Sequence, residues 1–379
     1  MITSIDEAVQ AVDLVLNSPT ARMPFPGKER PVLIYGAGHR GTQVFETLLA
    51  EGYNVVGFMD RGFSAIGTHL GRPAYPVCSA EELGLDGDPP HVLVAIFRHD
   101  IDISNLFQTL PELGFPGVSS FQELVEQFPG AFDMVLWQGG RTLLTQAREE
   151  LAKVLTLLAD DTSQQVFLEC LQLRCGNPLA MQQPDRHHQY FPPDLLPCDR
   201  GLRLVDCGAY DGDTFANILD QGIELEAFLA LEPDPTNFAK LAARMRAMTQ
   251  GPREITLVPC AAWNCTTTLR FGAGSEQNSQ VDSEGASFVQ AVRLDDVLAG
   301  FPTTWLKLDI EGAEMEALMG GRGVLERDHP FLAVAAYHFP DHLWKLPLTL
   351  HSWNLGYEFF LRPHGYAGVD MVLYARKAS

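Results

Sequence analysis

Apolar and polar positions follow two spacings over the first 130 residues. Short apolar runs, which predict strands, lie at residues 31–35, 53–59 and 91–96. Apolar residues spaced by three or four positions, which predict helices, lie at residues 2–16, 42–49, 101–113 and 120–128. Because a strand, a glycine-rich turn, a helix and a second strand follow one another, the pattern indicates a βαβ unit and a parallel sheet.

A second alternation of strands and helices begins at residue 202. Strands are predicted at residues 202–205, 227–231, 255–258, 305–308 and 332–336, with a closing antiparallel pair at 357–361 and 371–374. Helices are predicted at residues 214–219, 238–248, 313–319 and 342–355. Residues 266–294 alternate like the two strands of a hairpin around a turn rich in Gly and Ser.

The stretch between these regions is different. Apolar residues from Leu144 to Leu158 recur at helical spacing, and a candidate helix cap at residues 161–163 precedes a second predicted helix at residues 166–173. Five prolines between Pro178 and Pro197 make the remainder irregular. We therefore predict an α/β protein with two Rossmann-like, doubly wound domains at residues 1–130 and 201–379. A helical linker at residues 131–200 joins them. The length of 379 residues fits two cores, since a single core rarely exceeds about 250–300 residues.

Composition narrows the classes of function. The net charge of −21 argues against a nucleic-acid-binding protein, because binding to phosphates needs Lys and Arg. No apolar run approaches the roughly 20 residues of a membrane helix, and the first 16 residues lack the positive charge of a secretory signal. The seven cysteines include no Cys-x-x-Cys pair and are predicted to be free thiols. We expect a cytoplasmic protein.

The strongest chemical signal is a glycine turn after the strand at residues 202–205. Asp206, Gly208 and Gly212 form an Asp-x-Gly-x-x-x-Gly pattern, and Glu232 ends the next strand. Glycines let the backbone approach a ligand, and a carboxylate at Glu232 can accept hydrogen bonds from both ribose hydroxyls. The pair indicates a cofactor that contains adenosine. The spacing differs from the Gly-x-Gly-x-x-Gly of pyrophosphate binders and resembles the first motif of class I S-adenosylmethionine methyltransferases.

A second motif narrows this resemblance. The run Trp305-Leu-Lys-Leu-Asp-Ile-Glu-Gly-Ala-Glu314 resembles the signature of the FkbM family of methyltransferases. Further segments match that family's pattern in the same order, at residues 205–214, 231–234, 260–263, 337–344, 357–364 and 373–375. The resemblance covers about residues 185–379. It implies a class I methyltransferase fold for the second domain, S-adenosylmethionine as cofactor, and methyl transfer to the hydroxyl oxygen of a small molecule or sugar.

The resemblance also assigns residues to roles. It implies that the cofactor is bound by Asp206, Gly208, Tyr210, Gly212, Glu232, Ala261 and Ala262. The first glycine turn would border the methionine, Glu232 the ribose, and the two alanines the adenine. Asp309 would face the methionine ammonium or the substrate.

A hydroxyl acceptor needs a group that removes its proton, because the sulfonium is already a good leaving group. The candidates are Asp309, Glu311 and His338. Each has a structural alternative: Asp309 could cap a helix, Glu311 could complement a helix N-terminus, and His338 could be a hydrogen-bonded core residue. We predict no metal at these carboxylates.

The first domain carries its own ligand motif. Gly36, Gly38 and Gly41 follow a strand, and Asp60 ends the next, which is the pattern of dinucleotide binders. Residues 32–76 also resemble the N-terminal domain of nucleotide-sugar-handling proteins. NAD and a nucleotide-sugar are therefore both candidate ligands. The alternative is a domain retained for assembly or for presenting the substrate.

These observations favour an S-adenosylmethionine-dependent O-methyltransferase. Its expected partner is a small-molecule or sugar hydroxyl acceptor, with no nucleic acid and no membrane; assembly into a homo-oligomer stays open. One alternative is an NAD-dependent oxidoreductase that uses the first glycine motif, although the chain has no Tyr-x-x-x-Lys pair. The other is a non-catalytic nucleotide-binding protein.

Overall fold

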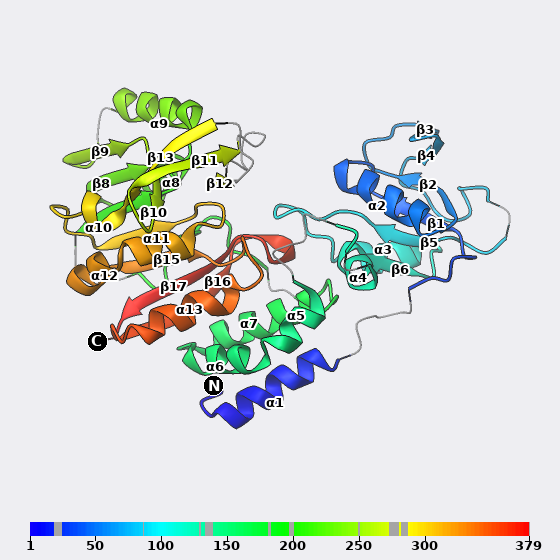
Figure 1. The fold of residues 1–379 in the computed structure, drawn as a ribbon. Helices are drawn as coiled ribbons and strands as arrows, with labels where there is room; N and C mark the ends of the chain where they lie inside the picture. The colour runs from blue at the N-terminus through cyan, green and yellow to red at the C-terminus, as the bar shows by residue number, and fades with distance from the viewer. Residues whose placement is uncertain are drawn as a thin grey trace.

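Three sheets organise the chain (Figure 1). The computed structural model describes residues 1–18, 25–85, 87–128, 130–132, 139–180, 183–196, 201–248, 251–272, 280–281 and 287–378. The first sheet comes from the first third of the sequence. The second sheet and a small third sheet come from the second half, and the expected α/β class is confirmed.

The first sheet has the order β3-β4-β2-β1-β5-β6. Its strands are β1 (Val32–Tyr35), β2 (Val55–Met59), β3 (Gly67–His69), β4 (Arg72–Tyr75), β5 (His91–Val94) and β6 (Val118–Ser120). All neighbours are parallel except β3 with β4. Helices α2 (His39–Ala50) and α4 (Phe121–Gln127) pack on one face, and α3 (Leu106–Glu112) packs on the other. The βαβ prediction is correct, but β3, β4 and β6 were not predicted, because their sequences contain no continuous apolar run like those of β1 and β5.

The second sheet has the order β16-β17-β15-β14-β7-β8-β9. Its strands are β7 (Leu202–Cys207), β8 (Leu225–Leu231), β9 (Glu254–Val258), β14 (Trp305–Leu308), β15 (Phe331–Ala335), β16 (Tyr357–Pro363) and β17 (Met371–Lys377). Neighbours are parallel except that β17 is antiparallel to β15 and β16, as the closing pair predicted. The strand order reverses between β7 and β14. In open α/β sheets this switch point is where ligands bind.

Helices cover both faces of the second sheet. One face carries α8 (Asp213–Asp220) and α9 (Pro235–Ala247). The other face carries α6 (Arg148–Leu157), α7 (Asp161–Arg174), α11 (Glu314–Gly320), α12 (Arg322–Asp328) and α13 (His342–Ser352). The short α10 (Leu294–Val297) precedes β14, and the one-turn η2 (Tyr366–Gly368) lies between β16 and β17.

The small third sheet lies beside the second. Its strands are β10 (Ala261–Trp263), β11 (Thr267–Gly272), β12 (Gln280–Val281) and β13 (Ser287–Arg293), in the order β10-β13-β11-β12. The pairing of β11 with β13 is antiparallel. The two strands predicted over residues 266–294 therefore pair as expected, with β12 between them in the sequence; most of the Gly- and Ser-rich turn predicted to join them lies outside the described residues.

The first helix, α1 (Ile5–Leu16), packs far from the first sheet (Figure 1). Its buried residues join α6 and α7 in the core of the second sheet, and Arg148 pairs with Asp13 at 2.5 Å. The helices α5 (Gly140–Gln146), α6 and α7, predicted as a linker, share this same core. Helix α1, which was assigned to the first domain, therefore packs with the second sheet and not with the first. The domain boundaries stay a prediction.

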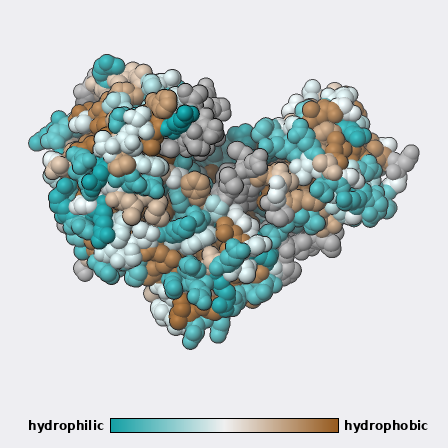
Figure 2. Space-filling model, viewed as in Figure 1, coloured by the Kyte–Doolittle hydropathy of each residue, from teal (hydrophilic) through white to brown (hydrophobic). Residues whose placement is uncertain are grey.

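The surface is hollowed between the lobe of the first sheet and the body of the second (Figure 2). On this face hydrophilic residues dominate, and the apolar patches are small and scattered. Within the described part of the chain, no helix is both long and apolar enough to cross a membrane.

Candidate functional site

In the glycine turn after β7, every second residue has a positive φ angle: Gly208 at 78°, Tyr210 at 47° and Gly212 at 88°. At Gly208, a Cβ atom would lie 1.9 Å from the carbonyl oxygen of Asp309, at the end of β14. The close approach of two strand ends therefore requires this glycine, in addition to any ligand. The sequence pattern located the turn but not this reason for it.

Asp206 was predicted to border the methionine, and the structure gives its side chain a protein partner. The carboxylate is fully buried, and its Oδ1 lies 2.9 Å from Nζ of Lys307 on β14. Burial raises the pKa of Asp206 to about 6. Although burial would lower the pKa of Lys307, Asp206 raises it above its ordinary value, so the pair is ionised at neutral pH. Asp206 thus lies beneath the turn as one half of a buried ion pair.

Lys307 also fixes the turn itself. Its ammonium donates to the carbonyl oxygen of Gly208 at 2.7 Å, and its side chain is only 3% exposed. Sequence reasoning missed this residue. The available signal was a lysine inside an otherwise apolar strand, because a buried charge needs a partner of opposite charge.

Glu232 lies at the end of β8, next to the turn. Its Oε2 accepts a hydrogen bond from the amide of Tyr210 at 2.9 Å, and its Oε1 accepts one from the amide of Asp234 at 2.8 Å. Burial raises the pKa of Glu232 to about 7, although these two amides oppose the rise. Each carboxylate oxygen has a second acceptor position, so the geometry is compatible with the predicted ribose contact.

Ala261 and Ala262 lie on β10, which follows β9. The Ala262 side chain is buried in the core of the second sheet, and Ala261 packs with β13. Both side chains are therefore used in packing. A contact with adenine at this strand, which stays a prediction, would come from the backbone.

His338, which follows β15, lies among three carboxylates. Its Nδ1 is 2.8 Å from Oε1 of Glu314, and its Nε2 is 3.3 Å from Oδ1 of Asp309 and 3.6 Å from Oε2 of Glu311. Glu314 is completely buried, and its Oε1 also accepts a hydrogen bond from the amide of Ile310 at 2.9 Å. The structure thus brings together the three predicted catalytic candidates, which come from two different strand ends.

The charges of this cluster follow from its contacts. Burial opposes a charge on His338, but Glu314, and then Asp309 and Glu311, raise its pKa to about 10. Burial also opposes a charge on Glu314, but His338 and His342 hold the pKa of Glu314 below its ordinary value. Burial raises the pKa of Glu311 to about 7, although His338 opposes the rise. At neutral pH, His338 is therefore a hydrogen-bond donor, and Glu311 can exchange a proton.

The backbone supports a special role for Glu311. Its φ angle is 54°, in the left-handed region that non-glycine residues rarely adopt, and Gly312 follows at 102°. A Cβ atom at Gly312 would lie 2.4 Å from the ring of Phe339, so the aromatic ring holds this turn closed. Strain of this kind is concentrated at functional sites.

Two tyrosines, which sequence reasoning missed, complete the site. Tyr190 donates from its hydroxyl to Oδ2 of Asp309, and Tyr337 hydrogen-bonds the buried Asp370. Burial raises the pKa of both tyrosines well above the ordinary value, so both hydroxyls keep their protons. Tyr190 lies in the irregular stretch before β7, where no local pattern marked it. Tyr337 begins the segment at residues 337–344 that resembles the family pattern, but no role was assigned to it.

A metal ion would find one candidate group in the part of the chain that the structure describes. Ligand atoms of Asp309, Glu314 and His338 lie within 4.8 Å of one another. Oε1 of Glu314 already accepts hydrogen bonds from Nδ1 of His338 and from backbone amides. Its Oε2 lies 3.3 Å from Nδ1 of His342. The expectation of a site without metal stays a prediction.

The first sheet brings its own motif together at the N-terminus of α2. Gly36 has a φ of 107°, and a Cβ atom at Gly41 would lie 2.1 Å from the carbonyl oxygen of Gly36. Asp60 accepts hydrogen bonds from the amides of Ala37 and Gly62, each at 2.7 Å. These contacts stabilise the turn. Space remains open beside Gly38, where a Cβ atom would meet nothing within 4 Å.

Comparisons with known proteins bear on the family and on the fold. Residues 206–366 match the model of the methyltransferase FkbM domain. A crystal structure of the methyltransferase FkbM from Methylobacillus flagellatus KT is similar, with a TM-score of 0.78 and 23% identity over 98% of both chains. This likeness shows that the fold is shared over both sheets. A search of curated proteins found no match.

Two further solved structures are more distant. Fibrillarin from Aeropyrum pernix, in complex with S-adenosyl-L-methionine, matches with a TM-score of 0.29 and 14% identity over 48% of this chain and 68% of that one. The CurJ carbon methyltransferase matches with a TM-score of 0.31 and 13% identity over 99% and 90%. Scores this low carry no argument about the fold or the site.

Proposed function

We propose that this chain, whose residues 206–366 form a methyltransferase FkbM domain, transfers a methyl group from S-adenosylmethionine to a hydroxyl oxygen of a small molecule or sugar. The observation that carries the proposal is the arrangement of Asp309, Glu311 and His338 at the ends of β14 and β15. A hydroxyl is a poor nucleophile until a base takes its proton, and this cluster contains one group suited to that task.

The residues present fit the methyl donor. Glu232 lies at the end of β8, where it can accept hydrogen bonds from ribose hydroxyls. Asp309, Glu311 and Glu314 carry more negative charge than His338 balances, which favours a positively charged ligand. The bound donor would supply an activated methyl group on a sulfonium that leaves as a neutral thioether.

Side chains of the protein would remove the proton from the acceptor and hold the reacting groups in place. Glu311, with a pKa of about 7, takes the hydroxyl proton as the oxygen attacks the methyl carbon. His338 donates from Nε2 toward Asp309 and Glu311 and holds the two carboxylates in place. Glu314 fixes the imidazole through Nδ1, and Tyr190 fixes Asp309. Glu311 is therefore the proposed general base, and His338 and Glu314 are positioning residues.

The direct test begins with S-adenosylhomocysteine, titrated calorimetrically into the full chain. A panel of alcohols, sugars and carbon acids would then be incubated with S-adenosylmethionine, and the position of the new methyl group determined by NMR. A methoxy signal supports the proposal. Methyl transfer to carbon would replace the O-methyltransferase assignment and leave the methyltransferase assignment in place.

Glu232→Ala is expected to weaken S-adenosylhomocysteine binding by about 1–3 kcal/mol, because ribose hydroxyls would lose a buried charged acceptor. The matched control is Glu254→Ala on the neighbouring strand β9. Glu254 begins β9, at the opposite end of the strands from Glu232, and it pairs with Arg203. Calorimetric titration measures both variants. Equal affinity of Glu232→Ala and the unaltered protein would exclude the ribose contact.

A ligand at the first glycine turn is a separate proposal, supported by the open space beside Gly38. NAD and uridine-diphosphate sugars are the probes. Gly38→Val is expected to abolish their binding while S-adenosylhomocysteine still binds, because φ at Gly38 is −77° and valine fits there without strain. Absence of binding by the unaltered protein, measured by calorimetry, would leave the first sheet with a role in assembly or substrate presentation.

A further inference from the structure

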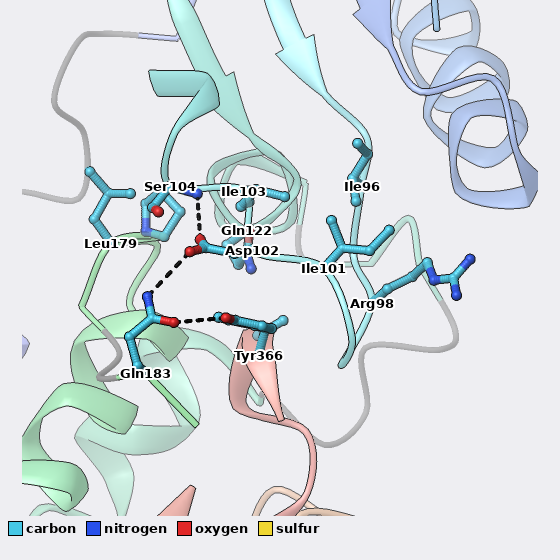
Figure 3. A pocket seen from close by; sticks show the side chains of 12 residues that line it. Ile96, Arg98, Ile101, Asp102, Ile103, Ser104, Gln122, Leu179, Gln183 and Tyr366 are labelled. Carbon is cyan, nitrogen blue, oxygen red and sulfur yellow. Dashed lines mark hydrogen bonds between the residues drawn. The ribbon is translucent and has the colours of Figure 1, made fainter. Parts of the chain in front are cut away.

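A pocket lies between the first sheet and the second half of the chain (Figure 3). Its volume is about 50 Å³. The loop after β5 contributes Ile96 and Ile101, helix α4 contributes Gln122, and the opposite wall is formed by Leu179, Gln183 and Tyr366. None of these residues was singled out in the sequence.

A chain of hydrogen bonds crosses this pocket from one half of the molecule to the other (Figure 3). Asp102 accepts from the amide of Ser104 at 2.8 Å and from Nε2 of Gln183 at 3.2 Å. The hydroxyl of Tyr366 donates to Oε1 of Gln183 at 2.7 Å. The backbone also joins the halves, since the Tyr366 amide donates to the carbonyl oxygen of His99 at 2.8 Å. The polar wall is therefore held in place before any ligand binds.

Gln122 supplies an acceptor that needs a partner. The residue is 3% exposed, and its Oε1 has no hydrogen-bond partner among the residues that the structure describes. A buried polar atom without a partner costs about 1–3 kcal/mol, and a ligand with a donor group would recover that cost. Together with Asp102 and the Tyr366 oxygen, it makes a wall rich in acceptors.

The charges in the lining disfavour an anionic ligand. Hydrogen bonds from Ser104 and Gln183 hold the pKa of Asp102 below its ordinary value against the effect of burial, so this carboxylate repels an anion. Arg98 is engaged by Asp100 through two hydrogen bonds, Nε to Oδ1 at 2.8 Å and Nη2 to Oδ2 at 2.7 Å. No free cation is left for a phosphate among these described side chains. Ile96, Ile101 and Leu179 offer apolar surface to C–H groups.

A short segment of chain connects the pocket to the proposed methyl-transfer site. Tyr366 precedes Asp370 by four residues, so their Cα atoms are at most about 15 Å apart. Asp370 bonds Tyr337, the neighbour of His338. Gly365 lies between the halves, where a Cβ atom would be 2.8 Å from Oδ2 of Asp370 and 3.0 Å from Cβ of His99. A ligand of moderate length could reach both places.

We propose that this pocket binds the far end of the methyl acceptor, and that the acceptor is a neutral, hydroxyl-rich molecule such as a sugar or another polyol. The first sheet thus selects the acceptor for the methyltransferase domain. A volume of about 50 Å³ holds only a few non-hydrogen atoms, such as one hydroxyl-bearing edge of a sugar ring. This inference rests on the proposed function.

The test uses the full chain and saturation-transfer NMR with methyl α-glucopyranoside, myo-inositol and glucose 6-phosphate as probes. We expect signals from the two neutral polyols and a weaker signal from the phosphate. Gln122→Leu removes the buried acceptor and is expected to weaken polyol binding about three- to tenfold, the loss of one hydrogen bond. Gln127→Leu, an exposed position on the same helix, is the matched control and is expected to bind normally.

Three results would overturn the inference: no polyol signal from the unaltered protein, a stronger signal from the phosphate, or equal polyol binding by Gln122→Leu and Gln127→Leu. S-adenosylhomocysteine is titrated into the same samples. If S-adenosylhomocysteine binds normally but the polyol test fails, only the proposal of an acceptor pocket is wrong. Failure of S-adenosylhomocysteine to bind the unaltered protein removes the proposed function itself. Once an acceptor is found, Gln122→Leu is expected to raise KM and leave kcat unchanged.

Discussion

Replacing Glu311 with glutamine is expected to lower kcat for methyl transfer about 10²- to 10⁴-fold, because the hydroxyl of the acceptor would lose its general base. Glutamine keeps the size and hydrogen-bonding reach of the side chain but cannot take a proton. The backbone at this position has a φ of 54°, so a substitution of similar shape is the least disturbing choice. The measurement is formation of methylated product at saturating acceptor and S-adenosylmethionine.

The pH profile provides a second readout. Below a pH of about 7, Glu311 holds a proton and cannot act as a base, so kcat is expected to rise through this pKa and then level off. His338 keeps its proton over the same range, because its pKa is about 10. His338→Gln removes the positive charge that opposes protonation of Glu311, so the inflection is expected to move to higher pH.

Two controls separate this mechanism from its rivals. Glu326→Gln, at a half-exposed position that pairs with Arg322 on α12, is expected to leave kcat unchanged. S-adenosylhomocysteine should bind Glu311→Gln normally, which shows that the variant is folded. If Asp309→Asn loses more activity than Glu311→Gln and abolishes the inflection near pH 7, the base is Asp309 and the assignment to Glu311 is wrong.

Lys307→Met is expected to lower the free energy of unfolding by about 3–5 kcal/mol, because it leaves the Asp206 carboxylate buried without its partner. Lys307 also donates to the carbonyl oxygen of Gly208, so the glycine turn loses a support. Denaturant unfolding followed by tryptophan fluorescence is a suitable measurement. Four of the five tryptophans lie at or after Trp263, so the signal reports mainly on the second half of the chain.

The comparison variants test the cause of this loss. Lys345→Met removes an exposed lysine that pairs with Asp341 at the surface, and is expected to change stability by less than about 1 kcal/mol. Asp206→Leu combined with Lys307→Met removes both charges and should recover much of the stability. A single Lys307→Met variant as stable as Lys345→Met would show that Asp206 does not depend on this ion pair.

Local features of the sequence were sufficient for much of the fold. Strand β14 was predicted with its observed limits, and most other strands of the second sheet were predicted to within a few residues. Periodicity works for these elements because long apolar runs and helical spacing are properties of consecutive residues. The same locality explains the failures. Strands β3, β4 and β6 contain polar residues, glycine or proline instead of an apolar run. Nothing in residues 2–16 indicates that α1 packs on α6 and α7.

In the candidate site too, short motifs could be predicted from the sequence and contacts between distant residues could not. The glycine turn, Glu232, and the acidic run from Asp309 to Glu314 could be found because each is a short motif at a strand end. Three other features could not be found from the sequence: the ion pair of Asp206 with Lys307, the contacts of His338, and the acceptor pocket at Gln122. They join residues from separate strands, loops and sheets.

The order of elements, the class of fold and the position of the glycine turn follow from the sequence, because backbone propensity and side-chain spacing act over a few residues. Which charges neutralise one another, and which loop of the first sheet meets the second half of the chain, became known from the three-dimensional fold. Those outcomes depend on strand order and on burial. Burial sets the charge of Glu311 and His338, and it cannot be read from neighbours in the chain.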